Sequence, residues 1–277
     1  WTVIIWTHLR NQKKKINEPF NLINENYYFS TEIPKLYLFI NFIYKSPEYF
    51  LITYILFAFL FINSKDFFIN KFELFNYKLL LLILILLYPN LILFFVPYPI
   101  YDGMRLFLWT LPYFCLIPGL TIYYLIDNLK FLKVKIIFVL LCLCFFYFFI
   151  NFLIITPYQY TYLNIFNGKK ENRYQKFEND YWGASLKELI NKSNLDFNKT
   201  IKFATCGVNA KIAKYYFKKK GNHNFRFVSA SDASYIIMTN RVTWNGNFIT
   251  CFDNFKGTNI SKVERNNLIL SVIRKID

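Results

Sequence analysis

The chain has 277 residues, of which 55% are hydrophobic and 22% aromatic, and it carries a formal net charge of +16. This composition is too apolar for a soluble fold with evenly spread apolar residues, so the excess must be concentrated in particular segments. A nucleic-acid partner is not expected, because no stacking motif or basic helix accompanies the charge, and a lysine-rich compositional bias with membrane flanking explains it better.

Residues 1–46 are expected to hold the end of one span and an external or interfacial loop. Trp1–Trp6 resembles the tail of a preceding span, with tryptophans where interfacial anchors usually sit. The chain begins at Trp1 with no Met and no leader pattern, so we expect further sequence upstream. The stretch Asn11–Ser46 is polar and mixed and contains Pro34, which predicts a loop rather than a span.

Residues 47–156 contain four long segments that are almost free of charge. Each approaches the roughly 20 residues that an α-helix needs to cross a bilayer. The sequence therefore predicts an α-helical transmembrane bundle of about four spans. These spans are expected at Pro47–Asn63, Lys78–Tyr98, Met104–Ile126 and Val134–Thr156.

Lysines in the short loops predict the orientation of the bundle. They lie between the first and second spans and between the third and fourth spans, whereas the loop Pro97–Gly103 has no Lys or Arg. By the positive-inside rule the lysine-bearing loops are cytoplasmic, which puts Pro97–Gly103 and everything after Thr156 outside. Lys35 and Arg105 oppose this orientation in part. We expect a multi-pass protein of the inner membrane, with the lipid bilayer as a partner and its C-terminal domain on the outer side.

Residues 157–277 are predicted to form a small extracytoplasmic α/β domain. Helical spacing marks Ala184–Ser193 and Asn209–Lys220, and alternation with strands implies a partly parallel sheet with helical cover. Cys206 and Cys251 could pair there if the domain faces an oxidising compartment, but the sequence leaves this pairing open. The expected strands are Thr200–Thr205, Phe225–Ser229, Tyr235–Thr239, Phe248–Phe252 and Leu268–Ile273.

A first polar constellation lies at the entry to the third span, in the run Tyr101, Asp102, Gly103, Met104 and Arg105. Asp102 and Arg105 are one helical turn apart and can pair, with Asp102 serving as an N-cap. One interpretation is a capped span with a local ion pair. The other is a polar site at the membrane surface for a phosphate or a sugar hydroxyl, since ionisable groups near a span are costly unless used.

A second constellation follows the fourth span. Tyr158 belongs to an aromatic and amide-rich run from Pro157 to Asn164, which is typical of interfacial anchors. Farther on, Asp180, Tyr181 and Trp182 place a carboxylate next to large aromatic rings, an arrangement that suits a sugar. A helix N-cap before Ala184 would explain the same residues equally well.

These segments resemble the C-terminal half of bacterial membrane glycosyltransferases of the protein-mannosyltransferase-like family. The similarity lies in four places, in order along most of the chain: Glu32–Tyr37 with Ser46 and Pro47, Tyr101–Arg105, Pro157–Asn164, and Asp180–Ser185. Two positions depart from the family pattern. Leu106 and Thr156 stand where the family usually carries His.

The resemblance implies a C-type glycosyltransferase superfold, a polyprenyl-phosphate-linked sugar donor and inversion at the anomeric carbon; the acceptor is unknown. The family's catalytic acids lie in its first external loop, which would fall upstream of Trp1, so the catalytic residues are unknown here. Arg105 could stabilise the departing lipid phosphate. The candidate substrate-binding residues are Tyr101, Asp102, Arg105, Tyr158, Asp180, Tyr181 and Trp182.

No cofactor is evident from the sequence, and a divalent metal is not indicated because neither His8 nor His223 has a partner at ligand spacing. The alternative to a glycosyltransferase is a non-catalytic, membrane-anchored protein whose outer domain binds a partner or a cell-envelope polymer. In that case Asp180 and Trp182 would be structural residues.

Overall fold

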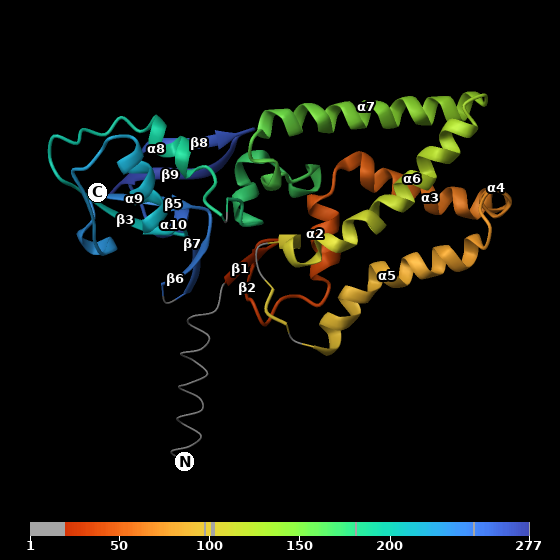
Figure 1. Ribbon diagram of the computed structural model, residues 1–277, viewed down its shortest axis with the longest axis horizontal. Coiled ribbons are helices and arrows are strands. Elements are labelled where there is room, and N and C mark those ends of the chain that lie inside the picture. The colour runs from red at the N-terminus through yellow and green to blue at the C-terminus, as the bar shows by residue number, and fades with distance from the viewer. Residues whose placement is uncertain (1–19, 97, 101–102, 181, 246, 277) are drawn as a thin grey trace, which may run out of the picture. The chain divides into compact units, whose positions relative to one another are not determined.

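The computed structural model describes residues 20–96, 98–100, 103–180, 182–245 and 247–276 (Figure 1). The chain divides into two compact units. Among the described residues, those within 34–156 and 162–166 form the helical unit, and those within 20–33, 157–161 and 167–276 form the α/β unit. The helical unit begins at residue 34, ahead of the first expected span, and its main part ends at residue 156, the expected end of the fourth span.

Three of the described helices are long and apolar enough to cross a membrane: α5 (Phe75–Phe95), η1 with α6 (Gly103–Thr110 and Leu111–Asp127), and α7 (Leu132–Ile155). The pair α2 (Tyr37–Lys45) and α3 (Glu48–Asn63), bent by 112°, is a fourth if it counts as one span. Only 6% of the most apolar stretch of α7 is buried inside the protein. The prediction of about four spans therefore corresponds to three or four helices that are long and apolar enough to cross a membrane and are mostly uncovered by protein.

The sequence missed two short helices of this unit, α2 and α4 (Lys65–Lys71). The stretch Asn11–Ser46 was expected to be a loop, yet its last part forms α2. The helix ends at Lys45, and Ser46 is extended with ψ of 148°, because the residue before Pro47 is sterically driven out of the helical region.

The core of the helical unit forms where α3, α4, α5 and α6 meet. Phe68 of α4 is fully buried, and its ring lies 5.3 Å from that of Phe75 and 5.6 Å from that of Phe57. Thr121 on α6 donates from its hydroxyl to the carbonyl of Thr53 on α3 at 3.0 Å. These contacts hold α3 and α6 close together, and they leave most of the apolar surface of α5 and α7 uncovered.

The α/β unit is built on a five-stranded sheet with strand order β4-β3-β5-β9-β8. β3 pairs in parallel with β4 and β5, whereas β9 runs antiparallel to both β5 and β8. The strands are β3 (Ile201–Cys206), β4 (Phe225–Phe227), β5 (Tyr235–Thr239), β8 (Thr258–Arg265) and β9 (Leu268–Lys275), drawn in cyan to dark blue in Figure 1. The prediction of a partly parallel sheet in a C-terminal α/β domain is confirmed.

Short helices and two hairpins complete the α/β unit. The helices are α8 (Leu186–Lys192), α9 (Ala210–Lys219) and α10 (Cys251–Asn254), with 3₁₀ turns at Gln159–Thr161, Lys170–Gln175 and Ala230–Asp232; a further 3₁₀ turn, Ile165–Asn167, lies at the unit boundary. The hairpins are β1 (Phe20–Ile23) with β2 (Asn26–Phe29) and β6 (Val242–Asn245) with β7 (Asn247–Thr250). A β-bridge between Ile23 and Phe177 joins the first hairpin to this unit.

Two details of the predicted sheet were wrong or missing. The strand expected at Phe248–Phe252 pairs with β6 in a separate hairpin instead of closing the five-stranded sheet, and it ends at Thr250. The chain then turns into α10, where the Thr250 hydroxyl caps the helix by accepting from the amide of Asp253. The strand β8 was missed because its sequence is polar and charged, as suits a strand at the edge of a sheet.

A disulfide joins Cys206, at the end of β3, to Cys251, at the start of α10, with 5.7 Å between the Cα atoms. Both residues are buried in a core cluster with Ile236, Met238 and Val272 of the central strands. The pairing that the sequence left open is therefore made in the structure. It closes a loop of 45 residues across the middle of the sheet.

Candidate functional site

The break between α2 and α3 is held by Asn164, which lies in the aromatic run after α7. Its amide nitrogen Nδ2 donates to the carbonyls of Ile43 at 2.5 Å and Ser46 at 2.9 Å, and its backbone N–H donates to the carbonyl of Tyr44 at 3.2 Å. The carbonyls at the end of a helix have no partner inside the helix. One almost fully buried asparagine therefore satisfies three carbonyls at the end of α2.

Glu48, in the first turn of α3, makes the second connection at this break. Its carboxylate accepts from the hydroxyl of Tyr162 at 2.6 Å and from the backbone N–H of Ile165 at 2.9 Å. A carboxylate at a helix N-terminus is also favoured by the helix dipole. The motif run after α7 and the Ser46-Pro47 break thus form one hydrogen-bonded junction within the helical unit.

The first predicted constellation lies next to another buried contact of the helical unit. The hydroxyl of Tyr37 donates to the carbonyl of Gly103 at 2.9 Å, and Gly103 has a φ of 69°, which favours glycine. Arg105 lies on the 3₁₀ helix η1 with an exposed side chain. Tyr101 and Asp102 lie outside the described residues, so the proposed pairing of Asp102 with Arg105 stays a prediction.

Asp180 is fully buried at the turn that leads into α8. Its carboxylate accepts from the backbone N–H groups of Ala184 at 2.8 Å and Ser185 at 2.9 Å, and from the hydroxyls of Ser185 and Tyr160. The Ser185 hydroxyl lies 2.6 Å from that of Ser271 on β9. This geometry is that of a buried carboxylate that closes the turn before α8, but Asp180 is not the N-cap itself, because α8 begins at Leu186 with Ser185 in the N-cap position.

Trp182 provides the exposed part of the same constellation. Its side chain is 51% exposed, and its ring stacks on that of Tyr160 with 5.6 Å between the centroids and 30° between the planes. Tyr160 also donates to Asp180, so the aromatic pair is anchored to the buried carboxylate. Tyr181 lies outside the described residues. The result is a supported aromatic face at the surface of the α/β unit.

Tyr158 belongs to a separate hydrogen-bonded cluster centred on Glu188 of α8. Oε2 of Glu188 accepts from the Tyr158 hydroxyl at 2.8 Å and from Nη2 of Arg265 at 2.6 Å, and Oε1 lies 2.6 Å from Nζ of Lys192. The Arg265 guanidinium also lies over the Tyr158 ring, 5.3 Å from its centroid. Tyr158 is therefore buried between a carboxylate and a cation.

The electrostatics of this cluster favour an ionised carboxylate. Burial raises the pKa of Glu188, but the hydrogen bonds from Lys192, Arg265 and Tyr158 outweigh it and lower the pKa to about 2. Burial, followed by the hydrogen bond to Glu188, raises the pKa of the Tyr158 hydroxyl above its ordinary value. The Tyr158 phenol is thus held as a neutral donor, and the cluster is suited to joining the segment after α7 to α8 and β8.

The structure brings together some of the predicted residues and not others. Asp180 and Trp182 share one constellation through Tyr160, Tyr158 belongs to the Glu188 cluster, and Arg105 lies in the other compact unit. No role was predicted for Glu188 from the sequence, although its spacing to Lys192 is the i,i+4 spacing of a helical ion pair. Among the described residues, no group of His, Cys, Asp and Glu side chains could hold a metal ion.

The chain matches no protein-family model, no curated protein and no solved structure. The resemblance to the mannosyltransferase-like family therefore depends on the motif residues alone. A function for this chain therefore has to be inferred from the geometry of its site and not from similarity to known proteins.

Proposed function

We propose that the chain is the C-terminal part of an integral membrane glycosyltransferase that moves a sugar from a polyprenyl-phosphate carrier to an acceptor at the outer face of the membrane. The observation that carries the proposal is the half-exposed ring of Trp182, stacked on Tyr160, whose hydroxyl is anchored by the buried carboxylate of Asp180. The proposal also uses the motif resemblance described above.

The aromatic pair has the properties of a sugar-binding face. A large exposed ring offers apolar area for the C–H face of a sugar, and a side chain that is already fixed loses little entropy on binding. The Asp180 carboxylate already accepts four hydrogen bonds from the protein, so we propose that it positions the aromatic pair and does not contact the sugar. Arg105, exposed on η1, is proposed to meet the lipid phosphate.

Membrane insertion and orientation are part of the proposal and have independent support. The uncovered apolar surface of α5 and α7 suits the hydrocarbon core of a bilayer. Disulfides such as Cys206–Cys251 persist in oxidising compartments, which supports an extracytoplasmic α/β unit. The lysine-bearing connections, one from Lys65 to Lys78 that includes α4 and one from Lys130 to Lys135 at the start of α7, would then be cytoplasmic.

The test is sugar transfer from a polyprenyl-phosphate-linked hexose in membrane vesicles that contain the protein with its upstream sequence. Trp182→Ala is expected to lower transfer at least tenfold, and Trp182→Phe to retain an intermediate rate, because a ring face is partly restored. The matched control is Tyr215→Ala on α9, which removes an aromatic side chain of the same unit that is 58% exposed. Equal transfer by Trp182→Ala and the control, at equal expression, would remove the aromatic pair from the site.

The binding of an envelope polymer without catalysis is the second candidate, and the full internal satisfaction of Asp180 favours it. The two candidates differ in what they require upstream of Trp1. A transferase needs a pair of acids in its first external loop, one of them acting as general base on the acceptor. If the upstream sequence lacks such acids while the protein still binds glycan, the non-catalytic function is correct.

A further inference from the structure

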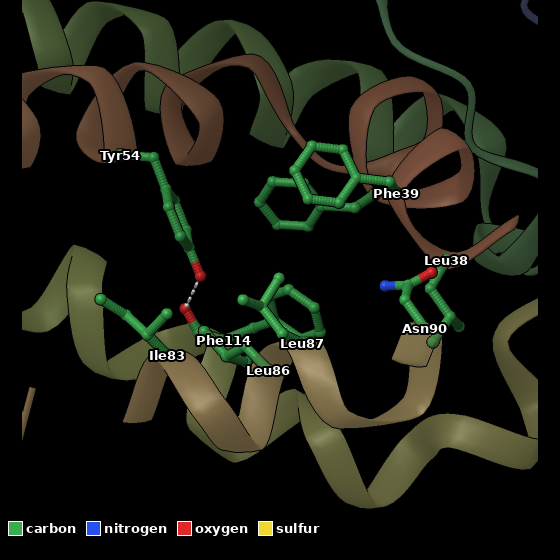
Figure 2. A pocket seen from close by; sticks show the side chains of 9 residues that line it. Leu38, Phe39, Tyr54, Ile83, Leu86, Leu87, Asn90 and Phe114 are labelled. Carbon is green, nitrogen blue, oxygen red and sulfur yellow. Dashed lines mark hydrogen bonds between the residues drawn. The ribbon is translucent and has the colours of Figure 1, made fainter. Parts of the chain in front are cut away.

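The helical unit contains a pocket of about 160 Å³ between α2, α3, α5 and α6 (Figure 2). Its lining is apolar apart from the amide of Asn90 and the hydroxyl of Tyr54, and the latter already donates to the carbonyl of Phe114 at 2.7 Å. The side chains that line it are Leu38, Phe39, Phe42, Tyr54, Ile83, Leu86, Leu87, Asn90 and Phe114. None of these residues belongs to the aromatic constellation or to the Glu188 cluster.

Asn90 is the feature that distinguishes this pocket from a packing defect. The residue is only 7% exposed, and its Oδ1 atom is buried without a hydrogen-bond partner among the described residues. Figure 2 shows the amide at one end of the pocket, with its nitrogen turned toward the other lining side chains. A buried amide oxygen left unpaired costs about 1–3 kcal/mol, and the nitrogen of the same amide, which faces the pocket, can donate to a ligand there.

The size and lining of the pocket define the apolar part of the ligand. A cavity of about 150 Å³ lined by Leu, Ile and Phe stays free of water and accepts a molecule the size of benzene, as known from another protein. This pocket therefore has room for a chain segment of about six carbons. Ile83 and Asn90 are seven residues apart on α5, which is about 10 Å along the helix axis, so an extended segment of that length fits between them.

The position of the pocket suggests where the ligand comes from. Phe39, Ile83 and Leu87 line the pocket and are also substantially exposed on the surface of the helical unit, which we propose faces lipid. Asn90 is five residues before the end of α5, about 7 Å from it, close to the depth at which the oxygen atoms of lipids begin. A chain could enter sideways from the bilayer with its polar end near Asn90.

We infer that this pocket binds the hydrocarbon chain of a membrane lipid alcohol, with the hydroxyl bonded to the amide of Asn90 and the first carbons packed between α2 and α5. A hydroxyl both donates and accepts, so it can pair with whichever atom of the Asn90 amide faces the pocket. The inference depends on the membrane insertion proposed above but not on sugar transfer.

The experiment uses the full chain in phosphatidylcholine vesicles and a hexadecanol probe that carries a diazirine close to the hydroxyl. After illumination, labelled peptides are expected from α2 and α5. Ile83→Trp, which fills the pocket, should lower this labelling at least fivefold. Leu80→Trp is the matched control, because Leu80 lies on the same helix, is 55% exposed and does not line the pocket, so labelling should be unchanged.

Competition tests the role of Asn90 in the unaltered protein. At equal mole fraction in the vesicles, hexadecanol should displace the probe about three- to tenfold better than hexadecane, because only the alcohol can pair with the amide. Farnesol, which is also an alcohol, should likewise compete better than hexadecane. The alcohol that competes more strongly shows whether the natural ligand has a linear or an isoprenoid chain. Asn90→Leu keeps the shape of the side chain and should abolish the preference for alcohols over hexadecane.

Two results would overturn the inference. One is equal labelling of Ile83→Trp and Leu80→Trp; the other is equal competition by hexadecane and hexadecanol in the unaltered protein. Extraction with alkaline carbonate distinguishes a failure of the proposed membrane insertion from a failure of the proposed lipid-alcohol site. A chain that is released from the vesicles contradicts the proposed membrane insertion, whereas a chain that stays inserted and is not labelled in α2 and α5 contradicts only the lipid-alcohol site.

Discussion

The hydroxyl of Tyr158 donates to Oε2 of Glu188 at 2.8 Å, and the guanidinium of Arg265 shares the same oxygen at 2.6 Å. Tyr158 follows the last long helix in sequence, Glu188 lies on α8, and Arg265 ends the edge strand β8. One carboxylate therefore connects three segments of the α/β unit that are far apart in the sequence. Such a cluster stabilises the unit only while the carboxylate is charged.

The stability of the α/β unit should fall in acid because of Glu188. Its pKa is about 2 in the folded protein, below the ordinary 4.5, so its contribution is present above pH 4.5 and is lost as the pH falls toward 2. Urea midpoints followed by tryptophan fluorescence should show a loss of about 1–3 kcal/mol between these pH values.

Glu188→Gln isolates this effect from the other carboxylates. The variant should be less stable than the unaltered protein at pH 7, and the difference between the two proteins should shrink as the pH falls through the window from 4.5 to 2. A difference that stays constant down to pH 2 would show that Glu188 does not titrate with the lowered pKa assigned to it.

Reduction of the Cys206–Cys251 disulfide should destabilise the α/β unit by about 2–4 kcal/mol, because the bond closes a loop of 45 residues in the unfolded chain. The check is the urea midpoint with and without dithiothreitol, with the Cys206→Ser, Cys251→Ser double variant as control. The double variant should be insensitive to dithiothreitol. An unaltered protein that is equally insensitive would contradict the prediction.

The sequence predicted well the elements whose signal is local. The helix α9 begins after Asn209, whose side chain accepts from the amide of Lys211, and the chain turns at Gly221 with a φ of 86°. Both signals lie within the helix and its ends, and the predicted Asn209–Lys220 is within a residue of the observed bounds. The long apolar helices were predicted for the same reason, since length and hydropathy are read from a single stretch.

The parts that the sequence missed depend on partners far away in the chain. Asn164 meets carbonyls about 120 residues earlier, and nothing in its local sequence indicates the end of α2. The sequence around Asp180 was compatible with a sugar site and with a helix start. The hydroxyls of Tyr160 and Ser185 donate to the Asp180 carboxylate and give it a structural role. Periodicity and spacing do not contain this information, because it arises only when separate segments pack.

The junction at the α2–α3 break should depend on Asn164. Asn164→Leu removes the amide that donates to the carbonyls of Ile43 and Ser46, and the loss of these two part-buried hydrogen bonds should cost about 1–3 kcal/mol. Thermal denaturation in detergent, followed by circular dichroism, measures the change. Asn63→Leu is the control, because the amide of Asn63 donates only to the nearby carbonyl of Phe59 at an exposed helix end.

Asn164→Asp distinguishes the effect of losing the hydrogen-bond donors from the effect of changing the size of the side chain. The carboxylate has nearly the same size as the amide but cannot donate, so it should destabilise the protein at least as much as Asn164→Leu at neutral pH. Stability equal to that of the unaltered protein would show that the carbonyls at the end of α2 do not need this donor.

Gly257 should be the least replaceable of the glycines in the α/β unit whose surroundings are described. It precedes β8 with a φ of 132°, and a Cβ atom at this position would lie 2.0 Å from the carbonyl oxygen of Lys275 on β9. The strained backbone and the overlap with another strand should together make Gly257→Ala about 3–5 kcal/mol less stable. Gly221→Ala provides the comparison, because Gly221 also has a positive φ of 86° but a Cβ atom there meets no atom within 4 Å. This substitution should therefore lower the stability by only about 1–2 kcal/mol. Urea midpoints of both variants measure the difference, and similar values would show that β8 can move away from β9 without loss of packing.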